Sequence, residues 1–268
     1  MKKIIAIMLA TLMLVCSLVS CGGGTSSDLA AIEEAGKIVI GVTVYPPMDY
    51  LDDKGEWTGF DAELAKKFAE SLGVNCQIVI ITWSNKVADL DTNQIDLVWN
   101  GMTASDDLGE EIDFSVSYAK NAQVAVVKKG SGITKADLTA GNVTVAVENG
   151  SAGENVARET LGVTDAKLVE SLDGQTGAVN EVNGGTSDVA VIDLTMAQSI
   201  IGKGDYAGLE IIDGAQYGEE IFAVGMRKGS DLKDKLDKFL KDSYKDGTMA
   251  NLVATKYPTV VINEDALK

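Results

Sequence analysis

A run of β-branched residues, Lys37-Ile-Val-Ile-Gly-Val-Thr-Val44, is followed along the chain by Thr58-Gly-Phe-Asp-Ala-Glu-Leu-Ala-Lys-Lys-Phe-Ala-Glu-Ser-Leu-Gly73. The first segment is mostly apolar without regular alternation, which predicts a strand buried on both faces. In the second segment an apolar side chain recurs every four residues, which predicts a helix with Asp61 as its N-cap and Gly73 as its stop. A buried strand followed by an amphipathic helix is typical of an α/β fold.

The rest of the chain continues this alternation of strands and helices. Short β-branched runs predict strands, and longer amphipathic runs between them predict helices. We expect strands at 77–82, 95–99, 123–127, 143–147, 167–170, 188–192 and 222–226, and helices at 152–161, 175–182, 194–201, 232–244 and 248–256. The sequence therefore predicts an α/β protein with parallel sheets.

The N-terminus has the order of an export signal. Two lysines in Met1-Lys2-Lys3 precede an almost unbroken apolar run over 4–19, slightly short of the ~20 residues that a membrane-spanning helix needs. The run ends in Leu18-Val19-Ser20-Cys21, which resembles the lipobox of bacterial lipoproteins. That resemblance implies a signal peptide over 1–20, cleavage before Cys21 and a lipid on its thiol. The alternative is an uncleaved membrane anchor.

The residues after Cys21 and the charge of the chain are also informative. Gly22 to Ser27 (GGGTSS) is too small and polar to pack, so we expect a lipidated tether over 21–30. The formal net charge is −17, which opposes binding to nucleic acid or anionic lipid headgroups. Nucleic-acid binding is therefore not expected.

Cysteine and histidine usage limits the possible chemistry. The chain has three Cys and no His, and only Cys76 lies in the part expected to fold. One thiol cannot form an intramolecular disulfide, and without a His to activate it we interpret Cys76 as a small buried side chain. The acidic residues have no EF-hand spacing, so we expect neither a metal site nor a cofactor.

Several segments resemble family 3 extracellular solute-binding proteins, the amino-acid receptors of ABC importers. They follow the order and spacing of that family along nearly the whole mature chain. The segments are Gly41–Met48, Gly59-Phe60-Asp61, Ile95–Thr103, Ile112–Ser115 with Tyr118, Asp137-Leu138, Val145–Ser151, Ser187–Asp193 and Met226–Gly229. Each of them alone is weak support, whereas their common order is strong support for the family.

The resemblance implies a two-lobed, periplasmic-binding-protein-like fold of type II with the ligand cleft between the lobes. One lobe would be formed by 31–121 with 221–268 and the other by 122–220. Two segments near 120–123 and 218–222 would cross between them. Hinge closure on the ligand would then signal to the importer that solute is bound.

In the first lobe the resemblance implies two aromatic contacts and one polar segment. Tyr45 falls where the family stacks a ring on the ligand, and Trp83 falls where a second ring covers it. Asn100, Gly101 and Thr103 match the segment whose carbonyls and hydroxyl meet the ammonium and carboxylate of the ligand. For both aromatic residues a place in the core is the alternative.

In the second lobe Asp193 matches the carboxylate that pairs with the α-ammonium. An Asp at the end of a buried apolar strand is unusual, and its alternative role is to cap the helix that follows. Ser151 and Ala152 lie at a strand-to-helix turn, where free N–H groups and the helix dipole favour an anion.

The chain departs from the family pattern at Leu108. The family places an Arg, which grips the α-carboxylate, six residues before the Phe of its Asp-Phe-Ser segment; counting back from Phe114 gives Leu108. The neighbourhood 106–111 holds four carboxylates and no basic residue, although these carboxylates have the alternative of being a solvated loop. Loss of a charge-assisted hydrogen bond of roughly 1.5–3 kcal/mol weakens a free amino acid by about one to two decades in affinity.

These positions lead to a hypothesis about the ligand. We expect an amino or other cationic group, with a carboxylate that is absent, masked, or bound only by backbone N–H groups near Thr103–Ser105 and Ser151–Ala152. An amine, an amino-acid derivative or a short peptide would fit. In the competing account Lys120 or Arg158 replaces the missing Arg, and an unmodified α-amino acid binds.

The sequence thus predicts the substrate-binding component of an ABC importer for amino acids or related small cationic or zwitterionic metabolites. Its partners would be a small-molecule ligand and a membrane permease, and a lipid would hold it at the extracytoplasmic face of the bacterial cell membrane. Without His or an activatable Cys we do not expect an enzyme. The alternatives are the extracellular sensor domain of a membrane kinase, although the chain stops at Lys268, and a dehydratase of the same fold.

Overall fold

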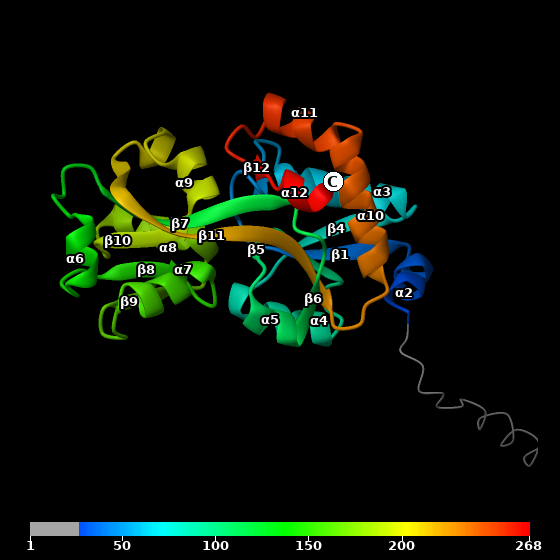
Figure 1. Cartoon of the computed structure of the whole chain (residues 1–268), viewed down its shortest axis with the longest axis horizontal. Coiled ribbons are helices and arrows are strands. Elements are labelled where there is room, and N and C mark those ends of the chain that lie inside the picture. Colours follow the sequence, from blue (N-terminus) through cyan, green and yellow to red (C-terminus); the bar gives the residue numbers. More distant parts are fainter. Residues whose placement is uncertain (1–26) are drawn as a thin grey trace, which may run out of the picture.

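A computed structural model describes residues 27–268. It has two lobes, and two long strands run from one lobe into the other (Figure 1). These connecting strands are β7 (Ala119–Lys128) and β11 (Leu209–Arg227). The predicted signal peptide and most of the predicted tether lie outside the described residues. The last three tether positions differ from the prediction, because Asp28 begins a helix that Ser27 caps by accepting a hydrogen bond from Ala30 N.

The first lobe contains the N-terminal strands, the C-terminal helices and the returning half of β11. Its strands are β1 (Lys37–Val42), β2 (Tyr50–Leu51), β3 (Trp57–Thr58), β4 (Asn75–Ile80), β5 (Leu97–Thr103), β6 (Ile112–Phe114) and β12 (Val261–Ile262). Its helices are α2 (Asp28–Ala35), α3 (Phe60–Ser71), α4 (Lys86–Asp91), α5 (Asp106–Glu111), α10 (Leu232–Lys245), α11 (Thr248–Thr255) and α12 (Glu264–Leu267).

The second lobe is built from the middle of the chain. Its strands are β8 (Val145–Glu148), β9 (Leu168–Ser171) and β10 (Val189–Asp193). Its helices are α6 (Lys135–Thr139), α7 (Ala152–Asn155), which continues as a π-helical turn, α8 (Gly174–Gly184) and α9 (Leu194–Ile200). Short apolar strands alternating with helices explain this arrangement, because each helix can cover the sheet that its neighbouring strands form.

The main sheet is mixed rather than parallel throughout. Its central order is β4-β1-β5-β11-β7-β10-β8-β9. The pairs β1–β4, β1–β5, β8–β10 and β8–β9 are parallel, as expected, whereas β11 is antiparallel to both β5 and β7, and β7 is antiparallel to β10. The prediction of parallel sheets was wrong for these central pairs, because β7 and β11 run in opposite directions between the lobes.

The predicted crossing segments 120–123 and 218–222 lie within this antiparallel pair. Glu220 is opposite Asn121, and Phe222 is opposite Ala119. The register shifts between Tyr217 and Glu220, so the pairing is irregular where the strands leave the second lobe. Strand irregularities of this kind bend the chain and redirect side chains, and here they lie next to the polar residues described below.

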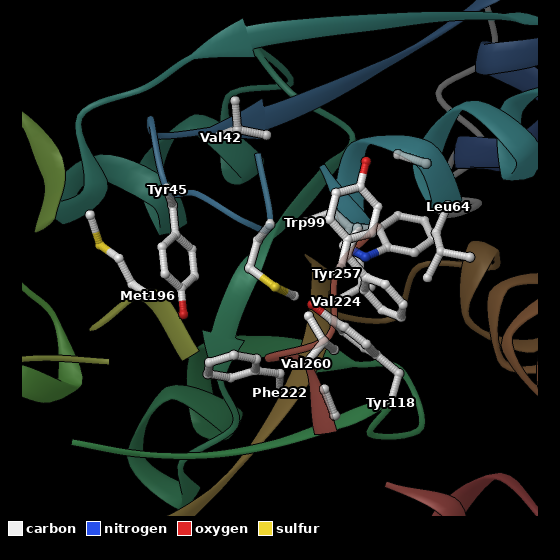
Figure 2. Close-up of a cluster of buried hydrophobic side chains, with 14 of the residues drawn as sticks. Val42, Tyr45, Leu64, Trp99, Tyr118, Met196, Phe222, Val224, Tyr257 and Val260 are labelled. Carbon is white, nitrogen blue, oxygen red and sulfur yellow. The ribbon is translucent and has the colours of Figure 1, made fainter. Parts of the chain in front are cut away.

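The largest buried cluster extends through both lobes. Figure 2 shows Trp99 and Tyr118 of the first lobe in this cluster with Met196 of α9. Trp99 packs against Phe68 and Tyr118 with ring centroids 6.2 and 6.4 Å apart. This core fixes β5, whose C-terminal half forms part of the site.

The start of α3 differs from the sequence expectation. The helix begins at Phe60, and its first N–H groups donate to the carbonyls of Pro47 and Met48. Asp61 is therefore not the N-cap: its side chain is buried and accepts hydrogen bonds from Gly101 N and the Tyr118 hydroxyl, both at 2.7 Å. Gly73 follows the helix in a left-handed conformation, in agreement with its predicted role as the stop.

The close approach before α3 requires glycine at position 59. Gly59 has φ +124°, and a Cβ there would lie 2.1 Å from the Met48 carbonyl oxygen. We expect Gly59→Ala to lower the free energy of unfolding by roughly 2–5 kcal/mol, from backbone strain and overpacking. Gly55→Ala is the control, because its φ is also positive but a Cβ would meet no atom within 4 Å; it should cost only about 1–2 kcal/mol. Equal urea-denaturation midpoints for the two variants would contradict this explanation.

Candidate functional site

A cavity of about 510 Å³ lies between the lobes, a size within the usual range of small-molecule sites. First-lobe residues from α4, β5 and α5 face second-lobe residues from β8, α7, α8 and β10. The lining residues are Trp83, Lys86, Asn100, Gly101, Met102, Thr103, Ser105, Asp107, Leu108, Glu111, Glu148, Gly150, Ser151, Ala152, Asn155, Val156, Glu159, Thr160, Gln175, Asp193 and Glu220. The cavity thus lies at the carboxyl ends of several strands, where α/β sheets commonly bind ligands.

Nine of the ten residues predicted to contact the ligand line this one cavity. They come from segments far apart in sequence: Trp83, Asn100, Gly101, Thr103, Ser105, Leu108, Ser151, Ala152 and Asp193. Tyr45 lies outside the lining set.

Tyr45 lies behind the cavity wall and is only 1% exposed. Figure 2 shows it in the buried cluster, and its ring packs edge-on against Phe222 with centroids 6.5 Å apart. A Cβ on Gly101 would lie 2.4 Å from the ring, so Tyr45 packs directly against that glycine. Burial, and next the nearby Asp193 charge, raise the pKa of the Tyr45 phenol. In this structure the ring is placed to support β5 and Asp193 from behind.

The Asn100 side chain joins two strands and is fully used in doing so. Its Oδ1 accepts hydrogen bonds from the backbone N and the hydroxyl of Thr43, at 2.9 and 2.8 Å. Its Nδ2 donates to Thr43 O at 3.1 Å and to Asp49 Oδ2 at 2.8 Å. This leaves Asn100 backbone atoms as the groups that can meet a ligand.

Asp193 is held by three amides from the second lobe and the crossing strand. It is buried, and its carboxylate accepts hydrogen bonds from Asn121 Nδ2, Gln123 Nε2 and Gln175 Nε2. Although Asp193 occupies the N-cap position of α9, its side chain makes no capping bond within the described part of the chain. The Thr195 N–H of that helix donates to Asn121 Oδ1 at 3.2 Å instead. The capping alternative for Asp193 is therefore wrong.

Glu220 forms a second carboxylate beside Asp193. Asn121 Nδ2 and Gln123 Nε2 each donate to both Asp193 Oδ1 and Glu220 Oε2. The Thr103 hydroxyl also donates to Glu220, at 3.1 Å. Burial, and next the charge of Glu220, raise the pKa of Asp193 to about 7. Two acidic groups joined only through neutral amides form a suitable site for a cation.

Glu148 ends β8 and is only 3% exposed. Its Oε1 is fully buried and has no hydrogen-bond partner among residues 27–268. Burial, and next the charge of Asp193, raise the pKa of Glu148 to about 8, while the charge of Lys86 and then the nearby Thr43 side chain offset part of this increase. Glu148 is thus a buried acid with one carboxyl oxygen that lacks a hydrogen-bond donor within the described residues.

Lys86 is the sole basic residue that lines the cavity in the described chain. Its ammonium donates to Trp83 O at 3.3 Å and to Gly150 O at 3.1 Å, and lies 4.9 Å from the centre of the Trp83 ring. Burial lowers the pKa of Lys86. The bond to Gly150 joins the two lobes, as does a bond from the Thr176 hydroxyl to Val44 O at 2.8 Å.

The wall around Leu108 is acidic and apolar. Leu108 packs against the cluster that contains Trp83 and Met102, while Asp107 and Glu111 from the same helix also line the cavity. Within residues 27–268, Lys120 and Arg158 do not line the cavity. The Lys120 ammonium lies 3.4 Å from Asp265, and Arg158 pairs with three carboxylates, those of Glu154, Asp165 and Glu170.

The two serine positions act as helix caps. Ser105 Oγ accepts from Leu108 N at 3.3 Å, and Ser151 Oγ accepts from Glu154 N at 3.2 Å. Gly150 N donates to Glu154 Oε2 at 2.7 Å. Two N–H groups around the 151–152 turn are therefore already occupied, which reduces what that turn can offer to an anion.

Sequence reasoning missed Lys86, Glu148, Gln175 and Glu220. Glu148 ends a buried apolar strand just as Asp193 does, so the reason for selecting Asp193 applied to it as well. Lys86 and Glu220 occur in ordinary polar segments, and only the fold shows that they reach the cavity. Among residues 27–268, no group of three or more possible ligands is arranged to hold a metal ion.

Comparisons with known proteins support one family. The model for bacterial extracellular solute-binding proteins, family 3, matches residues 38–257. The L-cystine-binding protein TcyJ of Escherichia coli (strain K12) is 29% identical over 228 residues, covering 84% of each chain. The arginine-binding extracellular protein ArtP of Bacillus subtilis (strain 168) is 29% identical over 255 residues, covering 94% of this chain and 96% of the relative.

A solved structure shows the same fold. The ancestral amino acid-binding protein AncCDT-1, described as a precursor of cyclohexadienyl dehydratase, superposes with a TM-score of 0.77 at 30% identity. The match covers 86% of this chain and all of that one. None of the helices between residues 27 and 268 combines the length and apolar character needed to cross a bilayer.

Proposed function

This chain belongs to the bacterial extracellular solute-binding proteins of family 3, and we propose that it binds a cationic, amine-bearing solute for an ABC importer. The named relatives bind cystine and arginine, and the arginine-binding protein matches almost the whole chain. A net positive solute is our inference from the cavity.

The charge of the cavity lining is the observation that carries this proposal. Six carboxylates line the cavity, whereas Lys86 is the one basic residue that does so in the described part of the chain; the acids are Asp107, Glu111, Glu148, Glu159, Asp193 and Glu220. A site lined predominantly by one sign of charge concentrates solutes of the opposite sign. We place the ligand's ammonium between Asp193 and Glu220, which share two amide donors.

The proposal retains an incomplete anion site at Leu108. Lys120 and Arg158 are engaged elsewhere, which counts against the competing account in which either replaces the family's Arg. Lys86 is the remaining candidate for a carboxylate, but two of its three donor hydrogens already meet backbone carbonyls. We therefore favour an amine, an amino-acid derivative or a basic amino acid over a neutral or acidic one.

We propose that the lobes comprise 31–121 with 221–268 and 122–220, and that they close by bending β7 and β11. Hinged closure around a ligand is a common mechanism for two-lobed receptors. The interlobe bonds from Lys86 to Gly150 and from Thr176 to Val44 are of the kind that would hold a closed form.

We also propose that the protein is a receptor and not an enzyme. The competing function is a dehydratase, and the raised pKa values of Asp193 and Glu148 are what such an enzyme would need in a general acid. Incubation of the protein with its bound ligand, followed by NMR of the released compound, separates the two. Unchanged ligand is expected, and stoichiometric conversion would favour the enzyme.

A thermal-shift panel tests the proposed ligand class. It comprises arginine, lysine, their amides and diamines, with glutamine, leucine and glutamate for comparison. We expect stabilisation by cationic members alone, because binding to the native state raises the melting temperature. Stabilisation by glutamate or leucine, with none by the cations, would refute the proposal.

A lipid at Cys21 remains a proposal for the part of the chain outside the described residues. We expect Cys21→Ser to move the protein from the membrane fraction to the soluble fraction, because diacylglycerol supplies two acyl chains and a single chain holds a protein only marginally. Cys76→Ser is the matched control and should stay with the membrane. Equal membrane retention of the Cys21→Ser protein and the wild type would rule out this anchor.

A further inference from the structure

We propose that Glu148 binds a second cationic group of the ligand, apart from the ammonium at Asp193 and Glu220, and thereby selects solutes with two positive charges. This inference rests on the proposed function, because it names the class of cation that the same cavity accepts.

Glu148 differs from the other two buried acids in its partners. Asp193 and Glu220 each accept hydrogen bonds from three side chains. Glu148 Oε1 has no such partner within the described chain, although Glu148 lines the cavity. Leaving a buried acceptor unpaired costs free energy, more so for a charged group. A ligand cation that reaches Glu148 would therefore remove an existing penalty.

Glu148 lies on a strand next to the first cation site but outside its hydrogen-bond network. It ends β8, whereas Asp193 ends the neighbouring parallel strand β10 and Glu220 lies on β11. Asp193 and Glu220 are joined by the Asn121 and Gln123 amides, and Glu148 is outside that hydrogen-bond network. The cavity thus presents two acidic positions on different strands.

The groups that face Glu148 come from β10, α4 and α8 and from the residue that follows β1. Asp193 adds negative charge from β10, and Lys86 adds positive charge from α4. Gly174 of α8 and Thr43 after β1 close its surroundings: a Cβ on Gly174 would lie 3.4 Å from Glu148 Oε1 and 3.3 Å from Thr43 Cβ. Lys86 forms no ion pair within 4 Å in the described chain, because its ammonium is directed to the Trp83 and Gly150 carbonyls. Glu148 is therefore left for a cation from outside the protein.

Calorimetry with matched pairs of probes tests this assignment. The pairs are arginine with citrulline, lysine with norleucine, and cadaverine with pentylamine; each second member keeps the shape and loses one positive charge. For the wild type we expect at least a tenfold preference for the member with two cationic groups in one or more pairs, because charge-assisted hydrogen bonds are stronger than neutral ones. In Glu148→Gln that preference should fall to about threefold or less.

Two further variants control for folding and for general electrostatics. Glu148→Asp keeps the charge but withdraws it from the cavity, so an intermediate preference is expected. Glu33→Gln removes the same charge from an exposed position on α2, outside the cavity lining, and the wild-type preference should remain. Ligand-free Glu148→Gln should melt at or above the wild-type temperature at pH 8, since it replaces an unpartnered buried acid by a neutral group.

The outcomes separate this inference from the proposed function. Two results would overturn the role of Glu148 while leaving an amine receptor intact. One is a preference for the second cationic group that persists in Glu148→Gln, and the other is equal wild-type affinity within all three pairs. Failure of all six probes to bind the wild type would contradict the proposed function itself.

Discussion

Asp193→Ala should abolish the stabilisation of the protein by its cationic ligand. Truncating one member of a buried charge pair typically costs about 2–5 kcal/mol, so affinity should fall by roughly 1.5 to 3.5 orders of magnitude. Asp193 is the acid on which the Asn121, Gln123 and Gln175 amides converge, and its loss would leave Glu220 alone at the first cation site. Thermal melts with and without ligand measure the effect.

Asp193→Asn is the matched control for shape. It keeps the side-chain volume and removes the charge, so it should lose the cation nearly as completely as Asp193→Ala. A structural role alone would give a different pattern: Asp193→Ala would lose stability because three amide donors are left without their acceptor, while the ligand shifts would be preserved. Wild-type ligand shifts in both variants would refute the assignment of Asp193.

Affinity for a cationic ligand should rise with pH. In the ligand-free protein Asp193 has a pKa of about 7 and Glu148 a pKa of about 8. Both acids hold a proton at pH 6 and must release it to pair with a cation. We expect at least about a tenfold gain in affinity between pH 6 and pH 8, measured with a ligand whose amines stay protonated throughout.

The ligand-free protein should show the opposite trend in stability. The folded pKa values lie above the unfolded ones, so from about pH 4 to pH 8 the native state holds protons that the unfolded chain has lost. Its free energy of unfolding should therefore decrease as pH rises through this window. Asp61, with a pKa raised to about 7 by burial, acts in the same direction and independently of ligand. Affinity that is constant or falls between pH 6 and pH 8 would contradict the assigned cation sites.

Much of the fold could be predicted from the sequence because its elements are locally encoded. The amphipathic run before Gly73 became α3, and the apolar run before Asp193 became β10. The antiparallel pairing of β7 and β11 could not be predicted, because it depends on contacts between residues about a hundred positions apart. The same reason explains the error at Asp61, whose partners are Gly101 and Tyr118 rather than its own helix.

The candidate site was only partly visible in the sequence. A polar residue that ends an apolar strand is a local signal, and Asp193 and Glu148 both carry it. Tyr45 was expected at the ligand, yet its place beneath Gly101 follows from the tight packing of β5 against it. Lys86 and Glu220 reach the cavity through the relative placement of the lobes, which no local pattern contains.

Native mass spectrometry of the gently purified protein tests the central claim most directly. The protein should carry one small molecule, and denaturation should release a compound with at least one amine and a net positive charge at neutral pH. The same preparation of Asp193→Ala should carry none. Recovery of a neutral sugar or an acidic solute from the wild type, retained in Asp193→Ala, would contradict a cationic ligand held by Asp193.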